Sequence, residues 1–254
     1  MNNYIIIYDG TFINLLTTIK YLLQANIKPQ KIVIEGTYSP SLFETIIKPN
    51  IDNDPTFITK ITKFSSKEIL KLITYIFLSN AKNKELVLYY LILNTFIYKD
   101  KIIYQRNLNC VNTAFKLAHH VSSENHKMKG FTRFKMINNK FLYAEISPDN
   151  NILELLSKHF QKRLKNELWI IKDTNRNILS IYDLNAYHIV SGENIKLLAL
   201  EKNNNDNYYE NLWCIFFKTI AIKERENKKC QMSFMPKKYW HNIIEMEDYN
   251  AKSN

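Results

Sequence analysis

The chain has 254 residues, and its 35 Lys or Arg outnumber its 24 Asp or Glu, which gives a formal net charge of +11. With 46% hydrophobic and 13% aromatic residues the chain can bury a packed core, which excludes wholesale disorder. Four Gly and six Pro exclude collagen-like and flexible-linker architectures. The charge fits an anionic partner such as nucleic acid, but AT-rich codons also favour Lys, so the bulk excess alone identifies no partner.

The N-terminal part of the chain predicts a small α/β unit. Residues 4–8 form a continuous β-branched and aromatic run, typical of a buried strand. Apolar residues then recur at helical spacing over residues 12–24, and residues 31–35 form a second short strand. Strand, helix and strand predict a parallel βαβ-like unit with a right-handed crossover. Residues 37–64 contain three Pro and predict a short helix and an extended piece.

The centre of the chain predicts helices. Apolar residues recur at helical spacing over residues 66–77, 85–98 and 109–121. The most apolar stretch, residues 86–97, is shorter than the roughly 18–20 residues that span a bilayer, so we expect a buried core helix. Three widely spaced Cys indicate no disulfide framework. Because the N-terminus also lacks a signal-peptide pattern, we expect a cytoplasmic protein without membrane contact.

Beyond Gly130 the hydrophobic period changes from helical to alternating. Residues 131–136 and 141–146 predict one hairpin, and residues 168–172 and 178–182 predict a second. A helix is expected between the hairpins, with Ser-Pro-Asp-Asn at residues 147–150 as its cap. The order ββαββ predicts an antiparallel sheet with a helix on one face.

The C-terminal part predicts two more helices. Apolar residues over 209–221 form an amphipathic stripe, which leads into the charged residues 223–229. Pro236 suits the first turn of a last short helix. We therefore predict an α+β fold in three regions. They are an N-terminal α/β unit (1–64), a helical region (65–128) and a C-terminal α+β domain (129–254), with 65–254 as a single domain the alternative.

No specific catalytic signature is present. The chain has no GxGxxG, P-loop or GxSxG motif, and no cluster of three Cys for an iron–sulfur centre. It therefore cannot be a radical S-adenosylmethionine enzyme by itself, and we expect no cofactor. His120 and Glu124 are four residues apart on one helix face, but two ligands do not make a metal site, so we expect no metal.

Four residues are candidates for acid–base catalysis: His126, His159, Asp173 and Asp183. Asp173 lies three residues before Arg176 in a hairpin connection, where the two side chains can pair and shape the turn. A carboxylate at a strand end is also a common catalytic placement. The residues alone therefore leave open whether this chain is an enzyme.

A second set of residues is suited to nucleic acid. Arg133 and Lys135 alternate with aromatic residues and predict a basic sheet face, either phosphate-binding or merely solvated. Arg163 ends a helix, where the macrodipole alone would favour it. Lys237 and Trp240 could bind phosphate and a base, or anchor the last helix in the core. The predicted nucleic-acid-binding residues are Arg133, Lys135, Arg163, Arg176, Arg225, Lys237 and Trp240.

Several blocks of the chain resemble the motifs of one protein family. Residues 126–134 resemble the EaHrxxGFxRF motif, 143–153 resemble YAxIxPDHNIL with Asn150 in place of His, and 159–163 resemble HFxxR. Residues 169–176 resemble WxIxDxxR, 212–240 resemble LWxxFFxxIxIxxRxN…FMPKxYW, and 8–12 resemble YDGSF. The blocks run in one order over nearly the whole chain. They resemble the probable DNA metabolism protein family, which carries domain of unknown function 4130. Arginines 133, 163, 176 and 225 all lie inside these blocks.

The resemblance implies a bacterial protein encoded beside a radical S-adenosylmethionine protein thought to modify or repair DNA. In some relatives the same domain is joined to a uracil-DNA glycosylase-like domain. We therefore expect an accessory protein of DNA metabolism or repair. It is expected to bind nucleic acid, with DNA as the expected kind, and to work with a radical S-adenosylmethionine partner. The alternatives are a nucleic-acid-processing enzyme that uses the His and Asp groups above, and a partner-binding scaffold without catalysis. The resemblance carries over no catalytic residues.

Overall fold

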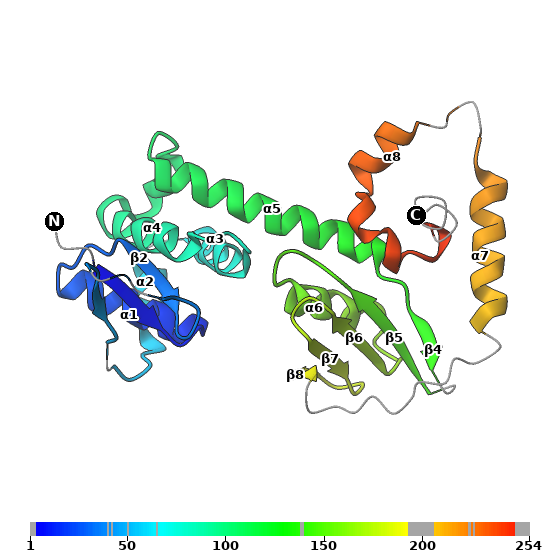
Figure 1. Ribbon diagram of the computed structural model, residues 1–254, viewed down its shortest axis with the longest axis horizontal. Helices are drawn as coiled ribbons and strands as arrows, with labels where there is room; N and C mark the ends of the chain where they lie inside the picture. The colour runs from blue at the N-terminus through cyan, green and yellow to red at the C-terminus, as the bar shows by residue number, and fades with distance from the viewer. Residues whose placement is uncertain are drawn as a thin grey trace. The chain divides into compact units, whose positions relative to one another are not determined.

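The computed structural model describes residues 4–39, 41, 43–49, 51–64, 66–137, 140–192, 206–222, 225 and 227–246. The chain divides into two compact units, residues 1–122 (unit 1) and 123–254 (unit 2), which are described separately (Figure 1). The predicted α+β class is confirmed: unit 1 holds a parallel three-stranded sheet and unit 2 a mostly antiparallel five-stranded sheet, both accompanied by helices.

The sheet of unit 1 has β1 (Tyr4–Tyr8) at its centre, between β2 (Lys31–Ile34) and β3 (Thr45–Ile47). Both neighbours run parallel to β1, which confirms the predicted βαβ-like unit. The connection from β1 to β2 is α1 (Phe12–Gln24), whose first turn is capped by the Thr11 side chain accepting from a backbone N–H. The buried, β-branched residues of β1 suit a strand covered on both faces.

The remaining helices of unit 1 bury its apolar residues. They are α2 (Thr56–Phe64), α3 (Lys67–Leu78), α4 (Lys84–Tyr98) and the 3₁₀-helix η1 (Lys99–Tyr104). The predicted core helix over residues 86–97 is confirmed as α4, in which Leu88 and Ile92 are fully buried in the unit 1 core. In the part of the chain that the structure describes, no helix is both long and apolar enough to cross a membrane.

The sheet of unit 2 has the strand order β4-β5-β6-β7-β8. Its strands are β4 (Lys135–Ile137), β5 (Phe141–Ile146), β6 (Trp169–Asp173), β7 (Ile178–Tyr182) and β8 (Tyr187–Ser191). The two predicted hairpins are present as the antiparallel pairs β4–β5 and β6–β7. The strand β8, which the sequence did not predict, pairs antiparallel with β7.

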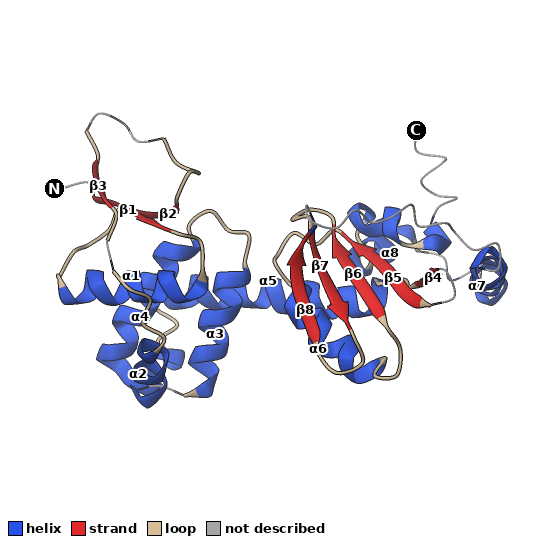
Figure 2. Ribbon diagram, turned by 90° about the horizontal axis from the view of Figure 1, so that it is seen from below, coloured by secondary structure: helices blue, strands red, loops and turns tan. Residues whose placement is uncertain are grey.

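The prediction of a wholly antiparallel sheet is wrong at one strand pair. β5 and β6 are parallel, because α6 (Leu153–Arg163) connects them and returns the chain to the same end of the sheet. Figure 2 shows α6 along one face of this sheet, where it packs against β6, β7 and β8. The indole of Trp169 in β6 stacks on the Tyr182 ring in β7, with the ring centroids 5.1 Å apart.

The first strand of the predicted C-terminal domain also needs correction. Residues 131–136 were expected to form a strand, but α5 (Asn109–Phe131) continues through Gly130, and β4 begins only at Lys135. Glu124 and Met128 are buried four residues apart, so this end of α5 belongs to the packed interior of unit 2. The structure therefore places Arg133 in a link between helix and strand instead of on a sheet face.

The C-terminal segment forms helices of two kinds. The amphipathic helix predicted over residues 209–221 is α7 (Asp206–Ile220). It is followed by α8 (Lys228–Phe234), which the sequence did not predict and whose first turn Asn227 caps by accepting from the Cys230 N–H. The predicted last helix is two 3₁₀ turns, η4 (Lys237–Asn242) and η5 (Ile244–Met246).

Candidate functional site

Several residues from or beside the family-like motifs of unit 2 meet at one loop, Ser147–Asn150, between β5 and α6. The sequence predicted this loop as a helix cap, but α6 begins at Leu153 without a side-chain cap. The loop is instead bound by α5: the Glu124 carboxylate accepts from the backbone N–H groups of Asp149 and Asn150, both at 2.8 Å, and from the Asn150 side chain at 2.6 Å. Glu124 is only 6% exposed.

The same carboxylate also binds the C-terminal segment. The Tyr239 hydroxyl of η4 donates to Glu124 at 2.5 Å. Burial, this hydrogen bond and the Glu124 charge raise the pKa of Tyr239 well above its usual value, so the phenol stays protonated and donates. Four donors therefore converge on one buried carboxylate, and both oxygens of Glu124 are in use. A metal at Glu124 would have to displace these bonds.

The turn between β6 and β7 holds the loop from another side. Asp173 is fully buried and forms an ion pair with Arg176 at 3.0 Å. The Arg176 guanidinium also donates to the backbone carbonyls of Pro148, at 3.0 Å, and Asp149. Burial raises the pKa of Asp173, while Arg176 and two backbone N–H groups of the turn act to lower it. The Asp173–Arg176 ion pair thus shapes the β6–β7 turn, and it also holds this turn against the Ser147–Asn150 loop.

The exposed side of the loop faces η4. Lys238 forms an ion pair with Asp149. The Ser147 hydroxyl lies 3.0 Å from Nε2 of His241 and accepts a hydrogen bond from the Asn242 side chain at 2.9 Å. A hydroxyl beside an imidazole is an arrangement that can transfer a proton, but the same contacts also dock η4 on the loop.

The four predicted acid–base residues occupy different elements. His126 is exposed on α5 and His159 is half-buried on α6. Asp173 is engaged by Arg176, and Asp183 accepts from the backbone N–H groups of the β7–β8 turn, which lower its pKa. Among the described residues, no hydrogen bond or ion pair joins any two of these four.

The predicted nucleic-acid-binding residues divide into internal and exposed groups. Arg133 forms an ion pair with the buried Glu245 at 2.6 Å and donates to the Gly130 carbonyl. Burial acts to raise the pKa of Glu245, but the Arg133 hydrogen bond and charge outweigh it, so the pKa is lowered. Trp240 is 6% exposed, and its indole N–H donates to the Met235 carbonyl at 2.8 Å. These contacts fit the alternative in which Trp240 anchors the last helix in the core.

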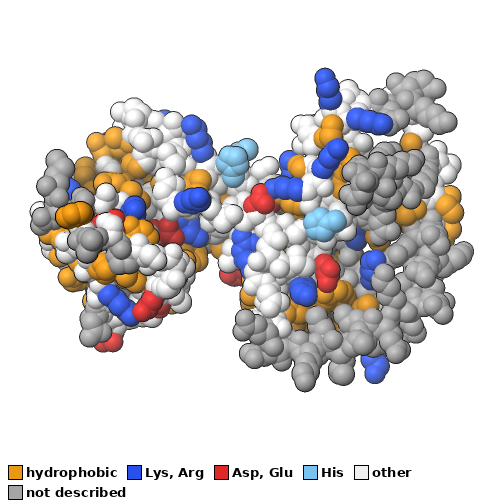
Figure 3. Space-filling view, viewed as in Figure 1, with side chains coloured by type: hydrophobic (Ala, Val, Ile, Leu, Met, Phe, Trp, Pro, Cys, Tyr) orange, Lys and Arg blue, Asp and Glu red, His pale blue; other side chains and the backbone are white. Residues whose placement is uncertain are grey.

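The exposed members lie on several elements. Arg163, Arg225 and Lys237 are exposed, and Lys135 in β4 is half-buried. The Lys237 ammonium lies 5.8 Å from the Trp240 ring centroid, within reach of a cation–π interaction. Figure 3 shows Lys and Arg side chains over the visible face of unit 2, with fewer Asp and Glu among them.

One group of positive side chains has no acidic counterpart. Lys129 at the end of α5, and His159 and Arg163 on α6, form what we call the basic cluster. Partial burial and the charges of Lys129 and Arg163 lower the pKa of His159. In the described ranges of the chain, neither Lys129 nor Arg163 forms an ion pair. The cluster therefore presents positive charge that is not neutralised within the described part of unit 2.

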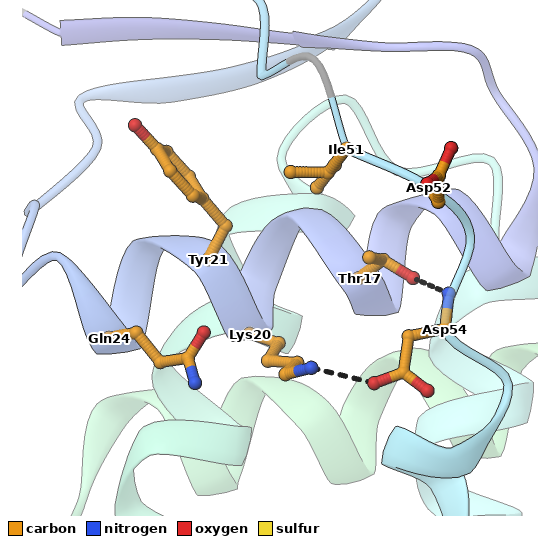
Figure 4. Close-up of a pocket in the computed structure, with 7 residues that line it drawn as sticks. All are labelled: Thr17, Lys20, Tyr21, Gln24, Ile51, Asp52 and Asp54. Atoms are coloured by element: carbon orange, nitrogen blue, oxygen red, sulfur yellow. Dashed lines mark hydrogen bonds and ion pairs between the residues drawn. The ribbon is translucent and has the colours of Figure 1, made fainter.

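Unit 1 contains a separate pocket of about 200 Å³ between α1 and the segment that follows β3 (Figure 4). Its lining residues are Thr17, Lys20, Tyr21, Gln24, Ile51, Asp52 and Asp54. The Lys20 ammonium forms an ion pair with Asp54 at 2.7 Å, and the Thr17 hydroxyl accepts from the Asp54 N–H. The hydrogen bond from Lys20, with two from Thr56, lowers the pKa of Asp54 to about 2.

Sequence reasoning missed the residues at the centre of the loop contacts. In the sequence Glu124 stands out only by its spacing from His120, and no local pattern distinguishes Asp149, Tyr239 or Lys129. One signal was present: all four lie within or beside the family-like motifs. Motif membership, however, does not distinguish a residue that holds the fold together from one that meets a ligand.

Comparison with known proteins gives one result. No curated protein and no solved structure matches the chain. The family model for a domain of unknown function, DUF4130, matches residues 82–245. The matched stretch is well over half of the 254 residues and includes the Ser147–Asn150 loop, every residue that binds it, and the basic cluster. The chain therefore belongs to the family defined by domain of unknown function 4130.

Proposed function

We propose that this chain is a nucleic-acid-binding accessory protein of DNA metabolism, and that the basic cluster of unit 2 is its phosphate contact. The observation that carries the proposal is that Lys129, His159 and Arg163 gather on two helices without an acidic partner in the described part of the chain. Like charges placed together destabilise the free protein, and a bound anion removes this repulsion. Arg and Lys are the side chains that bind nucleic-acid phosphates.

Three of the residues that the sequence suggested for nucleic acid are engaged within the protein. Arg133 and Arg176 are engaged in internal ion pairs, and the Trp240 ring is buried. Arg163 is exposed, and its partners in the cluster lie on the neighbouring helix end and one turn earlier on α6. A radical S-adenosylmethionine partner is supported only by the resemblance of the motif blocks, and failure of the two proteins to co-purify would remove that part of the proposal.

Replacing the two permanent charges of the cluster is expected to weaken DNA binding. In a fluorescence anisotropy titration with a labelled duplex and a single strand, the wild-type affinity should fall steeply as the salt concentration rises. Lys129→Gln and Arg163→Gln should each reduce the slope of log affinity against log salt by about 1, and the double variant by about 2. Lys158→Gln is the matched control, because Lys158 lies on the same helix but is paired with Glu154.

Two outcomes would contradict this proposal. Binding that does not depend on salt would show that phosphates are not the main contact. An equal loss of affinity in Lys158→Gln and Arg163→Gln would show that only bulk charge matters. Circular dichroism spectra of all variants would establish that each remains folded.

The pKa of His159 provides a test that needs no DNA. Partial burial and the charges of Lys129 and Arg163 hold this pKa below its usual value of 6.5. Arg163→Gln should therefore raise the pKa, and a bound oligonucleotide should raise it in the wild-type protein, because each change removes or offsets positive charge. The measurement is an NMR titration of the imidazole proton. An unchanged pKa in both experiments would separate His159 from the cluster.

A further inference from the structure

We propose that the pocket of unit 1 binds a single unpaired nucleobase, stacked on Tyr21 with its edge at Gln24. In Figure 4 the Tyr21 and Ile51 side chains stand on either side of an open space, and Gln24 lies one turn further along α1. The Tyr21 side chain packs against the unit 1 core, which fixes the ring. The site lies in a different unit from the basic cluster and does not require that the cluster bind DNA.

The size of the pocket selects a small planar ligand. A volume of about 200 Å³ is the space of about seven waters, at roughly 30 Å³ each. Drug-sized ligands occupy pockets of about 300–1,000 Å³, so this one suits a single ring system. An aromatic ring opposite an aliphatic side chain offers such a ligand one stacking face and one apolar wall.

The charges of the pocket exclude phosphate as the recognised group. Lys20 is the cation among the lining residues, and its ammonium is neutralised by Asp54 at 2.7 Å. With Asp52 also present, the lining carries a net negative charge, which would repel an anion. The part of the ligand inside the pocket is therefore not a phosphate or another anion.

Gln24 supplies the hydrogen-bonding chemistry. A carboxamide carries one acceptor and two donors in a plane, the pattern that matches the edge of a base, and that of adenine bidentately. Gln24 is exposed and, within the described ranges, has no hydrogen bond from its side chain. A stacking ring, an apolar wall and a free carboxamide together are the chemistry of base recognition, whether the base belongs to a free nucleoside or to a strand.

The test uses the full-length chain and the fluorescent base 2-aminopurine, whose emission falls when it stacks. One arm titrates the protein into 2-aminopurine riboside, and the other into a single-stranded oligonucleotide with one 2-aminopurine. We expect quenching that Tyr21→Phe retains and that Tyr21→Leu weakens on the order of ten-fold. Tyr104→Leu, which removes an exposed tyrosine elsewhere in unit 1, is the control.

The outcomes separate the ligand sources and the two proposals. Quenching of the riboside that depends on Tyr21 supports a free nucleoside, and quenching of the oligonucleotide alone supports a base within a strand. Riboside binding should not depend on salt, because the riboside carries no phosphate, whereas binding at the basic cluster should. No quenching in either arm, or equal quenching with Tyr21→Leu, would overturn the base site and leave the DNA proposal untouched.

Discussion

Glu124→Ala is expected to destabilise unit 2 by about 3 kcal/mol or more, and this is the largest single effect we predict. The variant removes the acceptor of four hydrogen bonds, two of which come from the backbone of the Ser147–Asn150 loop. A buried donor left without an acceptor costs roughly 1–3 kcal/mol. Because the loop, Asn150 and Tyr239 all lose their partner at once, several of these costs apply together.

Chemical denaturation of the purified chain, followed by circular dichroism, measures this loss. Glu124→Gln should recover only part of it, because the amide nitrogen that replaces one oxygen is a donor facing other donors. Glu154→Ala is the matched control: its carboxylate is exposed and paired with Lys158 on the surface of α6, so a change within about 0.5 kcal/mol is expected. Equal stabilities of the Glu124 and Glu154 variants would mean that Glu124 does not hold the loop.

The strands and helices of this fold follow from local pattern wherever one period dominates. The β-branched run of β1 and the apolar stripe of α4 were predictable, because each element buries its own residues in one core. The predictions were wrong where local signals compete with tertiary contacts. Gly130 suggested a break, yet α5 continues to Phe131, because Glu124 and Met128 on the same helix are buried in unit 2.

The contacts around the Ser147–Asn150 loop could not be read from local pattern. Asp173 and Arg176 are three residues apart, so their pairing was a plausible prediction from spacing alone. Glu124 and Tyr239 are separated by 115 residues, and Arg133 and Glu245 by 112. Single-sequence spacing carries no signal for such pairs. The charge of Arg133 and its alternation with aromatic residues therefore suggested a nucleic-acid contact, and only the fold reveals its ion pair with Glu245.

Arg176→Ala is expected to cost about 3 kcal/mol at neutral pH, because it leaves the fully buried Asp173 without its countercharge. The variant also loses the hydrogen bonds to the Pro148 and Asp149 carbonyls. Arg163→Ala is the control: this arginine is exposed, so its removal should change the free energy of unfolding by less than about 0.5 kcal/mol. The double variant Asp173→Ala/Arg176→Ala should lose less than the sum of the single variants, since neither charge is then buried alone.

The pH dependence of this variant tests whether charge is the cause. Burial raises the pKa of Asp173 in the folded protein, and Arg176 acts to lower it, so Arg176→Ala raises this pKa further. A carboxyl group whose pKa is raised by folding stabilises the protein fully at pH values below its usual pKa, which is 3.8 for Asp173. This stabilisation is lost as the pH rises through the pKa of the folded state. The free energy of unfolding that Arg176→Ala loses relative to wild type should therefore grow as the pH rises above 3.8, the usual pKa of Asp173.

Denaturation curves of both proteins at several pH values measure this difference in the free energy of unfolding directly. Below the usual pKa of Asp173 the carboxyl is neutral in both proteins, and only the smaller loss caused by the two missing carbonyl hydrogen bonds remains. Effects of other titrating groups cancel in the difference, because the two proteins share them. A deficit of the same size across the whole pH range would show that Arg176 stabilises the loop through its carbonyl contacts and not through the buried charge of Asp173.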